Sequence, residues 1–154
     1  MNKRLTPQQA MLKAASYCAY QERCHSEVEE KLAEWGVYGT DAGEIIIKLV
    51  EQNYLNEERF ARAFAGGKFR VKHWGRQKIR QELKARKVSE YCINAGMKEI
   101  DEDAYLETLT ELANEKMESV KGPNPMVRKS KTAQYLISKG YEPDLIWNLL
   151  RNIP

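Results

Sequence analysis

Positively charged side chains dominate the middle of the sequence, and their spacing suits contact with a negatively charged partner. Residues 65–88 carry nine lysine or arginine side chains and one acidic side chain, Glu82. If a helix begins near Gly75, four of these cations fall within an arc of about 80°, since successive residues turn by about 100°. A stripe of this kind matches a polyanion or an acidic protein surface, because each cation can neutralise a phosphate and release a counterion. A solvated helix face is the plainer alternative. The four cations are Arg76, Arg80, Lys84 and Lys87.

An aromatic side chain upstream of this stripe is a second candidate for partner contact. On a regular helix Phe69 lies opposite the expected core face, between Lys68 and Arg70. An exposed aromatic ring between cations is a recognisable contact for a protein or a nucleobase. Alternatively, Gly66-Gly67 breaks the helix, shifts its phase and buries the ring. The side chains expected on the core face are Phe60, Phe64, Val71 and Trp74. The predicted contact residues are Lys68, Phe69, Arg70, Lys72, Arg76, Arg80, Lys84 and Lys87.

Catalytic and metal-binding patterns are not found in the sequence. The two histidines, His25 and His73, lack a motif that would make either a general base, and the three cysteines lack the paired spacing of a zinc site. There is no GxxxxGK(S/T) phosphate loop and no GxGxxG segment. The acid-rich stretch 99–118 follows a helical pattern, which favours a solvated face over a metal site. We therefore expect a protein that is not an enzyme and that needs no metal or cofactor.

The composition fits a folded protein with an uneven charge distribution. Hydrophobic residues make up 42% and charged residues 31%, which is too apolar for disorder and too charged for a membrane protein. The net charge of +3 conceals local values of −2 over 1–64, +8 over 65–88, −7 over 89–120 and +4 over 121–154, which indicates an oriented electrostatic surface. The N-terminus lacks the apolar stretch of a secretory signal, and three cysteines argue against a disulfide framework, so we expect a cytoplasmic protein.

Cap and turn residues divide the chain into helices. Thr6 before Pro7 is typical of a helix start, and Ser26 followed by Glu29 has the spacing of a capping box. No segment alternates as a half-buried strand does. The sequence therefore predicts an all-α protein. The expected helices cover 7–22, 26–35, 41–53, 56–73, 76–87, 89–99, 102–119, 125–139 and 143–152.

A repeated apolar pattern groups these helices in threes. The spacing i, i+4, i+9 occurs in three copies that lie 51 and 53 residues apart, with two positions on one helix face and the third beyond the helix end. Gly36 and Gly140 precede the third position, where a left-handed C-cap is expected, and Lys87 stands there in the second copy. The copies are Val28, Leu32, Val37; Ile79, Leu83, Val88; and Thr132, Leu136, Tyr141. The pattern predicts three tandem three-helix modules, at 1–54, 55–100 and 101–154.

Four segments resemble the RecX family of bacterial recombination regulators. Residues 54–61, YLNEERFA, are similar to the family's G-Y-L-D/N-D/E-x-R-F/Y-A, and residues 75–83, GRQKIRQEL, to its G-x-x-K/R-I-x-x-E-L. Residues 23–32, RCHSEVEEKL, resemble the family's opening segment, and 133–141, AQYLISKGY, the ending of its third repeat. The segments follow the family's order over most of the chain. Two positions depart from it: Asn53 stands where glycine is common, and Arg76 where proline is frequent.

This resemblance implies three tandem three-helix repeats in an elongated, curved protein. It also implies a monomer that binds along the groove of the RecA–DNA filament and inhibits the ATPase and strand exchange of RecA in DNA repair. Contacts with single- and double-stranded DNA would be weak and non-specific, and no cofactor would be required. The predicted contact residues from Lys68 to Lys87 would carry the electrostatic contact, with Phe69 as an anchor.

Two other functions are compatible with helical modules and a basic centre. A stand-alone helix-turn-helix protein would prefer particular duplex sequences, whereas a filament binder would bind filaments much more tightly than DNA. A helical-repeat scaffold would use the charge asymmetry only to choose its protein partner.

Overall fold

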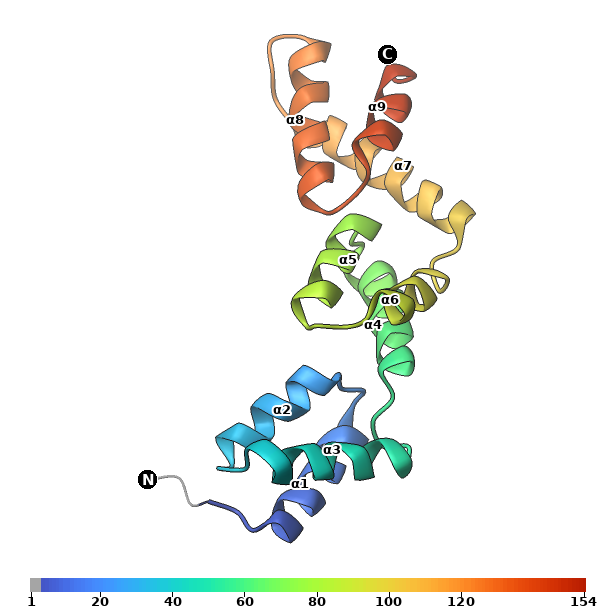
Figure 1. Ribbon diagram of the computed structural model, residues 1–154. Coiled ribbons are helices and arrows are strands. Elements are labelled where there is room, and N and C mark those ends of the chain that lie inside the picture. The colour runs from blue at the N-terminus through green and yellow to red at the C-terminus, as the bar shows by residue number, and fades with distance from the viewer. Residues whose placement is uncertain (1–3) are drawn as a thin grey trace. The chain divides into compact units, whose positions relative to one another are not determined.

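A computed structural model describes residues 4–154, and over that range the chain is helical with no strand. This confirms the all-α prediction (Figure 1). The expectation of a missing secretory signal falls partly on residues 1–3, outside the described residues. The helices are α1 (Pro7–Tyr20), α2 (His25–Glu34), α3 (Gly39–Glu51), α4 (Glu57–Lys72), α5 (Arg76–Ala85), α6 (Glu90–Met97), α7 (Glu102–Ser119), α8 (Pro125–Ser138) and α9 (Pro143–Arg151).

The two helix starts predicted from capping residues have different outcomes. Thr6 forms a capping box at α1, where its hydroxyl accepts a hydrogen bond from the Gln9 backbone N–H at 3.2 Å. The prediction of Ser26 as the cap of α2 is wrong. Helix α2 begins at His25 with Cys24 in the N-cap position, and the Ser26 hydroxyl instead donates to the Arg86 carbonyl at 2.7 Å. Ser26 therefore ties α2 to the turn after α5.

The three copies of the apolar repeat close the same turn. All nine residues of the pattern are buried. In each copy the backbone N–H of the third residue donates to the carbonyl of the second, at 2.9 Å for Val37, 3.1 Å for Val88 and 3.1 Å for Tyr141. The preceding residue has a positive φ, which is 61° at Lys87 and falls on glycine in the other two copies. This is the hydrogen-bond pattern of a Schellman C-cap, so the repeat marks both a buried helix face and the turn that follows it.

Two compact units make up the described chain. The N-terminal unit comprises the described residues up to Ala63 together with Leu83–Gly96, and the C-terminal unit comprises Phe64–Glu82 and Met97–Pro154. The division cuts through α4 and α5, so the second half of α4 and the first half of α5 belong with the last three helices. The compact units thus follow a different division from the three modules that the repeat predicts.

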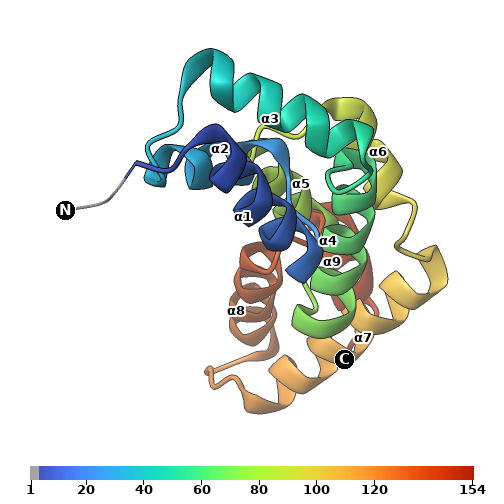
Figure 2. The same cartoon turned by 90° about the horizontal axis from the view of Figure 1, so that it is seen from below.

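The N-terminal unit is built on α1, α2 and α3, which pack on one another (Figure 2). Val28, Leu32 and Leu49 have no exposed surface and form the centre of its core. The segment Leu83–Gly96, which also belongs to this unit, is joined to it by polar contacts as well. The Ser89 backbone N–H donates to the Glu57 carboxylate at 2.9 Å, which fixes the start of α6 against the start of α4.

The C-terminal unit is built on α7, α8 and α9, which also contact one another (Figure 1). Leu136, Ile146 and Leu150 are fully buried. The rings of Tyr105 and Tyr141 lie at the centre of this unit with centroids 5.0 Å apart and no exposed surface. Among the described residues, no helix is long and apolar enough to span a bilayer.

Candidate binding surface of the basic segment

The predicted contact residues are divided between the two compact units. Lys68, Phe69, Arg70, Lys72, Arg76 and Arg80 belong to the C-terminal unit, whereas Lys84 and Lys87 belong to the N-terminal unit. Arg70, Lys72, Lys84 and Lys87 are exposed, while the side chains of Lys68, Arg76 and Arg80 are half-buried. The four exposed cations are therefore the predicted contact residues with the most solvent-accessible side chains.

The expectation that Phe69 is an exposed anchor is wrong. The side chain of Phe69 is only 6% exposed, and its ring lies 5.8 Å, centroid to centroid, from the buried ring of Tyr105. Helix α4 runs without a break through Gly66-Gly67, so the helix break considered as an alternative is also not the cause. Phe69 is buried because residues from α7 cover this side of α4.

The predicted core face of α4 is correspondingly wrong in its second half. Val71, placed on that face, is 74% exposed. Ala61, Ala65 and Phe69, which follow one another at i+4 spacing, are buried instead. The two halves of α4 belong to different compact units, so one apolar stripe does not describe the whole helix.

Arg76 is engaged inside the C-terminal unit. Its guanidinium Nη1 lies 2.8 Å from Glu102 and its Nη2 lies 2.8 Å from Glu142, and the group stacks 4.0 Å from the centroid of the Tyr105 ring. The Arg76 backbone N–H donates to the Tyr105 hydroxyl at 3.0 Å, and that hydroxyl donates to the Glu142 carboxylate. These contacts neutralise the charge of Arg76, so its expected role in partner contact does not fit its placement.

The two buried tyrosines complete this internal network. Burial is the main cause that raises the pKa of both phenols above the ordinary value of 10.0, and at Tyr105 the hydrogen bond to Glu142 raises it further. The Tyr141 hydroxyl donates to the His73 carbonyl at 2.9 Å. Both phenols therefore stay protonated. Tyr105 holds the start of α5 by accepting the Arg76 N–H, and Tyr141 holds the His73 turn by donating to its carbonyl.

Two glycines bring the backbones of these segments together. The Gly75 N–H donates to the Lys139 carbonyl at 2.7 Å, and the Gln77 N–H donates to the Gly140 carbonyl at 2.9 Å. A Cβ atom on Gly75 would collide with the Gly140 carbonyl and with the Tyr141 nitrogen. Sequence reasoning assigned Gly140 to a C-cap but missed this contact, because nothing in the local pattern pairs Gly75 with Gly140.

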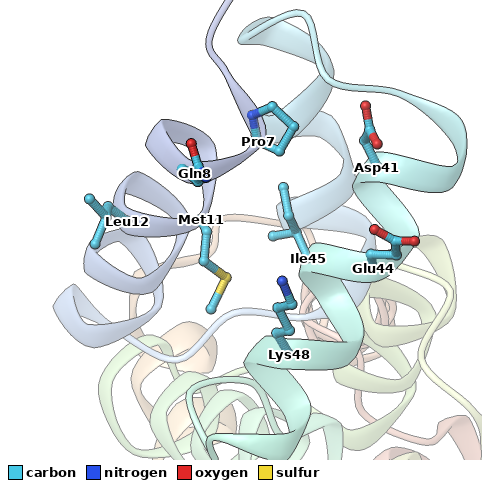
Figure 3. Close-up of a pocket in the computed structure, with 8 residues that line it drawn as sticks. All are labelled: Pro7, Gln8, Met11, Leu12, Asp41, Glu44, Ile45 and Lys48. Carbon is cyan, nitrogen blue, oxygen red and sulfur yellow. The ribbon is translucent and has the colours of Figure 1, made fainter.

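A shallow apolar groove of about 350 Å³ lies between α1 and α3 in the N-terminal unit (Figure 3). Pro7 and Met11 from α1 and Ile45 from α3 line it, and Figure 3 shows the carboxylates of Asp41 and Glu44 along the α3 side. None of its eight lining residues is a histidine, cysteine or serine. The groove is thus a mainly apolar surface with charged side chains along its α3 side.

Histidine and cysteine side chains are possible metal ligands or nucleophiles in the part of the chain that the structure describes. Within residues 4–154, no group of three His, Cys, Asp or Glu side chains is placed to hold a metal ion. Cys18 and Cys24 are free and buried, and burial raises the pKa of both thiols. A raised pKa keeps a thiol protonated and unreactive at neutral pH. His25 faces Glu57, with Nδ1 3.6 Å from the carboxylate, in a contact between α2 and α4.

Comparisons with known proteins assign the family. Residues 56–97 match the domain described as "RecX, second three-helix domain", and residues 102–150 match "RecX, third three-helix domain". The chain is 31% identical over 139 residues to the regulatory protein RecX of Bacillus cytotoxicus, and 28% identical over 139 residues to that of Bacillus mycoides. Each alignment covers 90% of this chain and 52% of the relative, so the chain spans about half the length of these curated relatives.

Solved structures show the same fold. The crystal structure of RecX from Lactobacillus salivarius superposes with a TM-score of 0.85 at 20% identity, over 96% of both chains. A second crystal structure, of the regulatory protein RecX, gives a TM-score of 0.85 at 20% identity over 95% of this chain and 73% of that one. The two domain matches and the curated relatives show that the chain belongs to the RecX family, a family of regulatory proteins rather than enzymes.

Proposed function

We propose that this chain regulates the RecA recombinase, mainly as an inhibitor, by binding the RecA–DNA filament and lowering its ATPase and strand-exchange activity. The observation that carries the proposal is the match of residues 56–97 and 102–150 to two successive RecX modules, because the family's name points to RecA. The protein would act in the cytoplasm as a monomer, in DNA repair and recombination, and would bind both single- and double-stranded DNA weakly and without sequence preference.

The four exposed cations described above, all within the basic residues 65–88, are the proposed contact residues for the filament. Arg70 and Lys72 lie at the end of α4, Lys84 lies near the end of α5, and Lys87 lies in the turn after α5. None of these four side chains forms an ion pair with a carboxylate within residues 4–154. Their charge is available to phosphates or to acidic side chains of RecA, because no internal partner neutralises it. Arg76 would contribute indirectly, by holding the C-terminal unit together.

Charge reversal within each unit tests these residues separately. Filament binding should be measured by co-sedimentation with RecA on single-stranded DNA, using the variants R70E/K72E and K84E/K87E and a K13E/K48E control. Lys13 and Lys48 are exposed, and the control makes the same change in net charge. Filament binding should weaken about tenfold in at least one test variant, as expected for the loss of two contacts between a cation and a phosphate. Binding by the control should stay near that of the unaltered protein. Equal binding by all three variants would reject the assignment.

The same assay separates the filament regulator from a stand-alone DNA-binding protein. A filament regulator should bind RecA–DNA filaments much more tightly than DNA alone. Tight binding to one duplex sequence, with no preference for filaments, would contradict the proposed function and favour the helix-turn-helix alternative.

A further inference from the structure

Two aromatic rings of the C-terminal unit each have two lysine ammonium groups near the ring. The Nζ atoms of Lys68 and Lys78 lie 4.9 Å and 4.5 Å from the centroid of the Trp74 ring. The Nζ atoms of Lys116 and Lys139 lie 4.5 Å and 5.9 Å from the centroid of the Tyr135 ring. These distances are in the range of cation–π attraction. We call these six residues, Lys68, Trp74, Lys78, Lys139, Tyr135 and Lys116, the lysine–aromatic track.

Backbone contacts join the two halves of the track. The Lys139 side chain donates a hydrogen bond to the Lys72 carbonyl at 3.2 Å, and the Lys139 carbonyl accepts one from the Gly75 N–H. Lys78 packs against the residue that follows Lys139, since a Cβ atom on Gly140 would lie 2.4 Å from the Cβ of Lys78. The pKa of Lys139 is lowered, first by burial and second by the charge of Lys78. The two lysine–ring groups are therefore neighbours in the C-terminal unit, one at the end of α4 and the start of α5, the other at the ends of α7 and α8.

The four lysines of the track have no internal counter-charge. Within residues 4–154 no carboxylate forms an ion pair with any of them, in contrast to Arg76, which is paired with Glu102 and Glu142 in the same unit. All six side chains of the track are half-buried, so each reaches the surface while its position is fixed by neighbours. Several fixed, uncompensated cations in a row favour a ligand with repeated negative charge over a single anion.

The track is distinct from the stripe that the sequence predicts on α5. Lys78 lies about 200° around the helix from Arg76, on the opposite side from that stripe. Lys116 lies in α7, Tyr135 lies in α8 and Lys139 is the C-cap residue of α8, so all three lie outside residues 65–88. No spacing rule within one helix would find them.

We propose that the lysine–aromatic track binds single-stranded nucleic acid, with its lysines on the phosphates and with Trp74 and Tyr135 offering ring faces to the bases. A single strand is favoured over a duplex because its bases are free to stack on aromatic side chains between cations. The choice of a nucleic acid as ligand rests on the proposed function. The contact itself requires no RecA.

The test is binding of a fluorescein-labelled oligothymidylate, followed by fluorescence anisotropy without RecA at several salt concentrations. The variant K78E/K139E is compared with K13E/K48E, which carries the same charge change in the N-terminal unit. K78E/K139E should bind about tenfold more weakly and lower the salt-dependence slope by about 1.4, the value for losing two single-strand phosphate contacts. The control should stay within about twofold of the unaltered protein. Equal loss in the two variants would overturn the proposal.

A ring substitution tests the part played by stacking. Tyr135→Leu should weaken binding by at least about fivefold, because one stacked base contributes roughly that much or more. A labelled duplex should bind more weakly than the single strand. Tighter binding of the duplex together with no effect of Tyr135→Leu would contradict the single-strand assignment and leave only non-specific charge attraction.

Folding and the proposed function are controlled separately. Circular dichroism and thermal unfolding identify any misfolded variant. If charge reversal unfolds the protein, K78Q/K139Q replaces it, with K13Q/K48Q as its control. Because this change removes charge without reversing it, K78Q/K139Q should then bind the single strand about threefold more weakly than the unaltered protein. If single-strand binding depends on the track but RecA activity does not respond to the protein, the proposed function fails and this inference stands. If RecA activity responds but single-strand binding is unaffected by the track variants, this inference fails and the proposed function stands.

Discussion

Arg76 Nη2 lies 2.8 Å from the carboxylate of Glu142, so the start of α5 is ion-paired with the residue at the N-cap position of α9. The same carboxylate accepts a hydrogen bond from Tyr105 on α7. Arg76, which interrupts the family's usual glycine–proline step, thereby connects three segments of the C-terminal unit. Its charge stabilises this unit and is not displayed to a partner.

Replacing this arginine should destabilise the fold. Arg76→Gln leaves Glu142 and Glu102 without their cation, and we expect the free energy of unfolding to fall by about 2 kcal/mol, since the pair is only partly exposed. Urea denaturation followed by circular dichroism measures the change. Arg151→Gln, at an exposed arginine at the end of α9, is the control and should change stability by less than about 0.5 kcal/mol. Equal small effects would contradict the structural role of Arg76.

The Gly75 contact predicts a sharp difference between two glycines. Gly75→Ala would drive a Cβ into the backbone at Gly140, which cannot move aside as a side chain can, and should cost about 3 kcal/mol or more of stability. Gly67→Ala, in the middle of α4, meets no atom within 4 Å and should stabilise the helix by up to about 1 kcal/mol. Thermal unfolding of the two variants side by side checks this. If both substitutions are tolerated, the close approach of Gly75 and Gly140 is wrong.

Phe69 and Val71 offer a test of which side of α4 is buried. Phe69→Ala should lower the free energy of unfolding by about 3 kcal/mol, because the ring is enclosed beside Tyr105. Val71→Ala should change it by less than about 0.5 kcal/mol, because that side chain is exposed. A larger loss of stability for Val71→Ala than for Phe69→Ala in urea denaturation would contradict the burial of Phe69 and favour the core face that the sequence predicts, with Val71 buried.

Alkaline pH should destabilise the protein through its buried tyrosines. The pKa of Tyr105 and of Tyr141 is raised in the folded state, mainly by burial, whereas the unfolded chain ionises near the ordinary value of 10.0. The two protonated tyrosines therefore contribute fully to stability below pH 10. As the pH rises above 10, the free energy of unfolding should fall by about 1.4 kcal/mol per pH unit for each tyrosine, because the unfolded chain loses its phenolic protons first.

Tyr141→Phe isolates one of these groups. The variant loses the hydrogen bond to His73, so its free energy of unfolding at neutral pH should be lower. Above about pH 10, its free energy of unfolding should fall less steeply with pH, because one of the two tyrosines no longer titrates. Urea denaturation at a series of alkaline pH values gives both quantities. An unchanged slope would show that Tyr141 does not titrate differently in the folded and unfolded states.

Local patterns were sufficient to predict the helices and the repeat. Thr6 caps α1 as expected because the capping box is complete within four consecutive residues. The repeat residues Leu32, Leu83 and Leu136 are fully buried because each sits just before a turn whose hydrogen bonds are also local. Predictions of this kind succeed where the signal and its partner lie within one helix and its cap.

The candidate contact residues were harder to predict because their partners are distant in sequence. A helical wheel places Phe69 opposite Phe60, but it cannot show that Tyr105 covers that side. Arg76 has the spacing of one cation in a stripe, but Glu102 and Glu142, which neutralise it, lie on other helices or their caps. Lys139 has no local signal because its neighbour Lys78 belongs to another helix. Charge can be predicted from the sequence, whereas neutralisation and burial depend on tertiary contacts.

The most direct test of the proposed function is the DNA-dependent ATPase of RecA, titrated with this protein. RecA from the same organism and single-stranded DNA are used, with points well below one protein per RecA. Regulation of the filament predicts that ATPase activity falls as the protein is added, and loss at low ratios would indicate blocked filament growth or filament destabilisation. An ATPase rate that stays constant up to saturation, with no protein bound to the filaments, would contradict the proposed function and leave the fold unaffected.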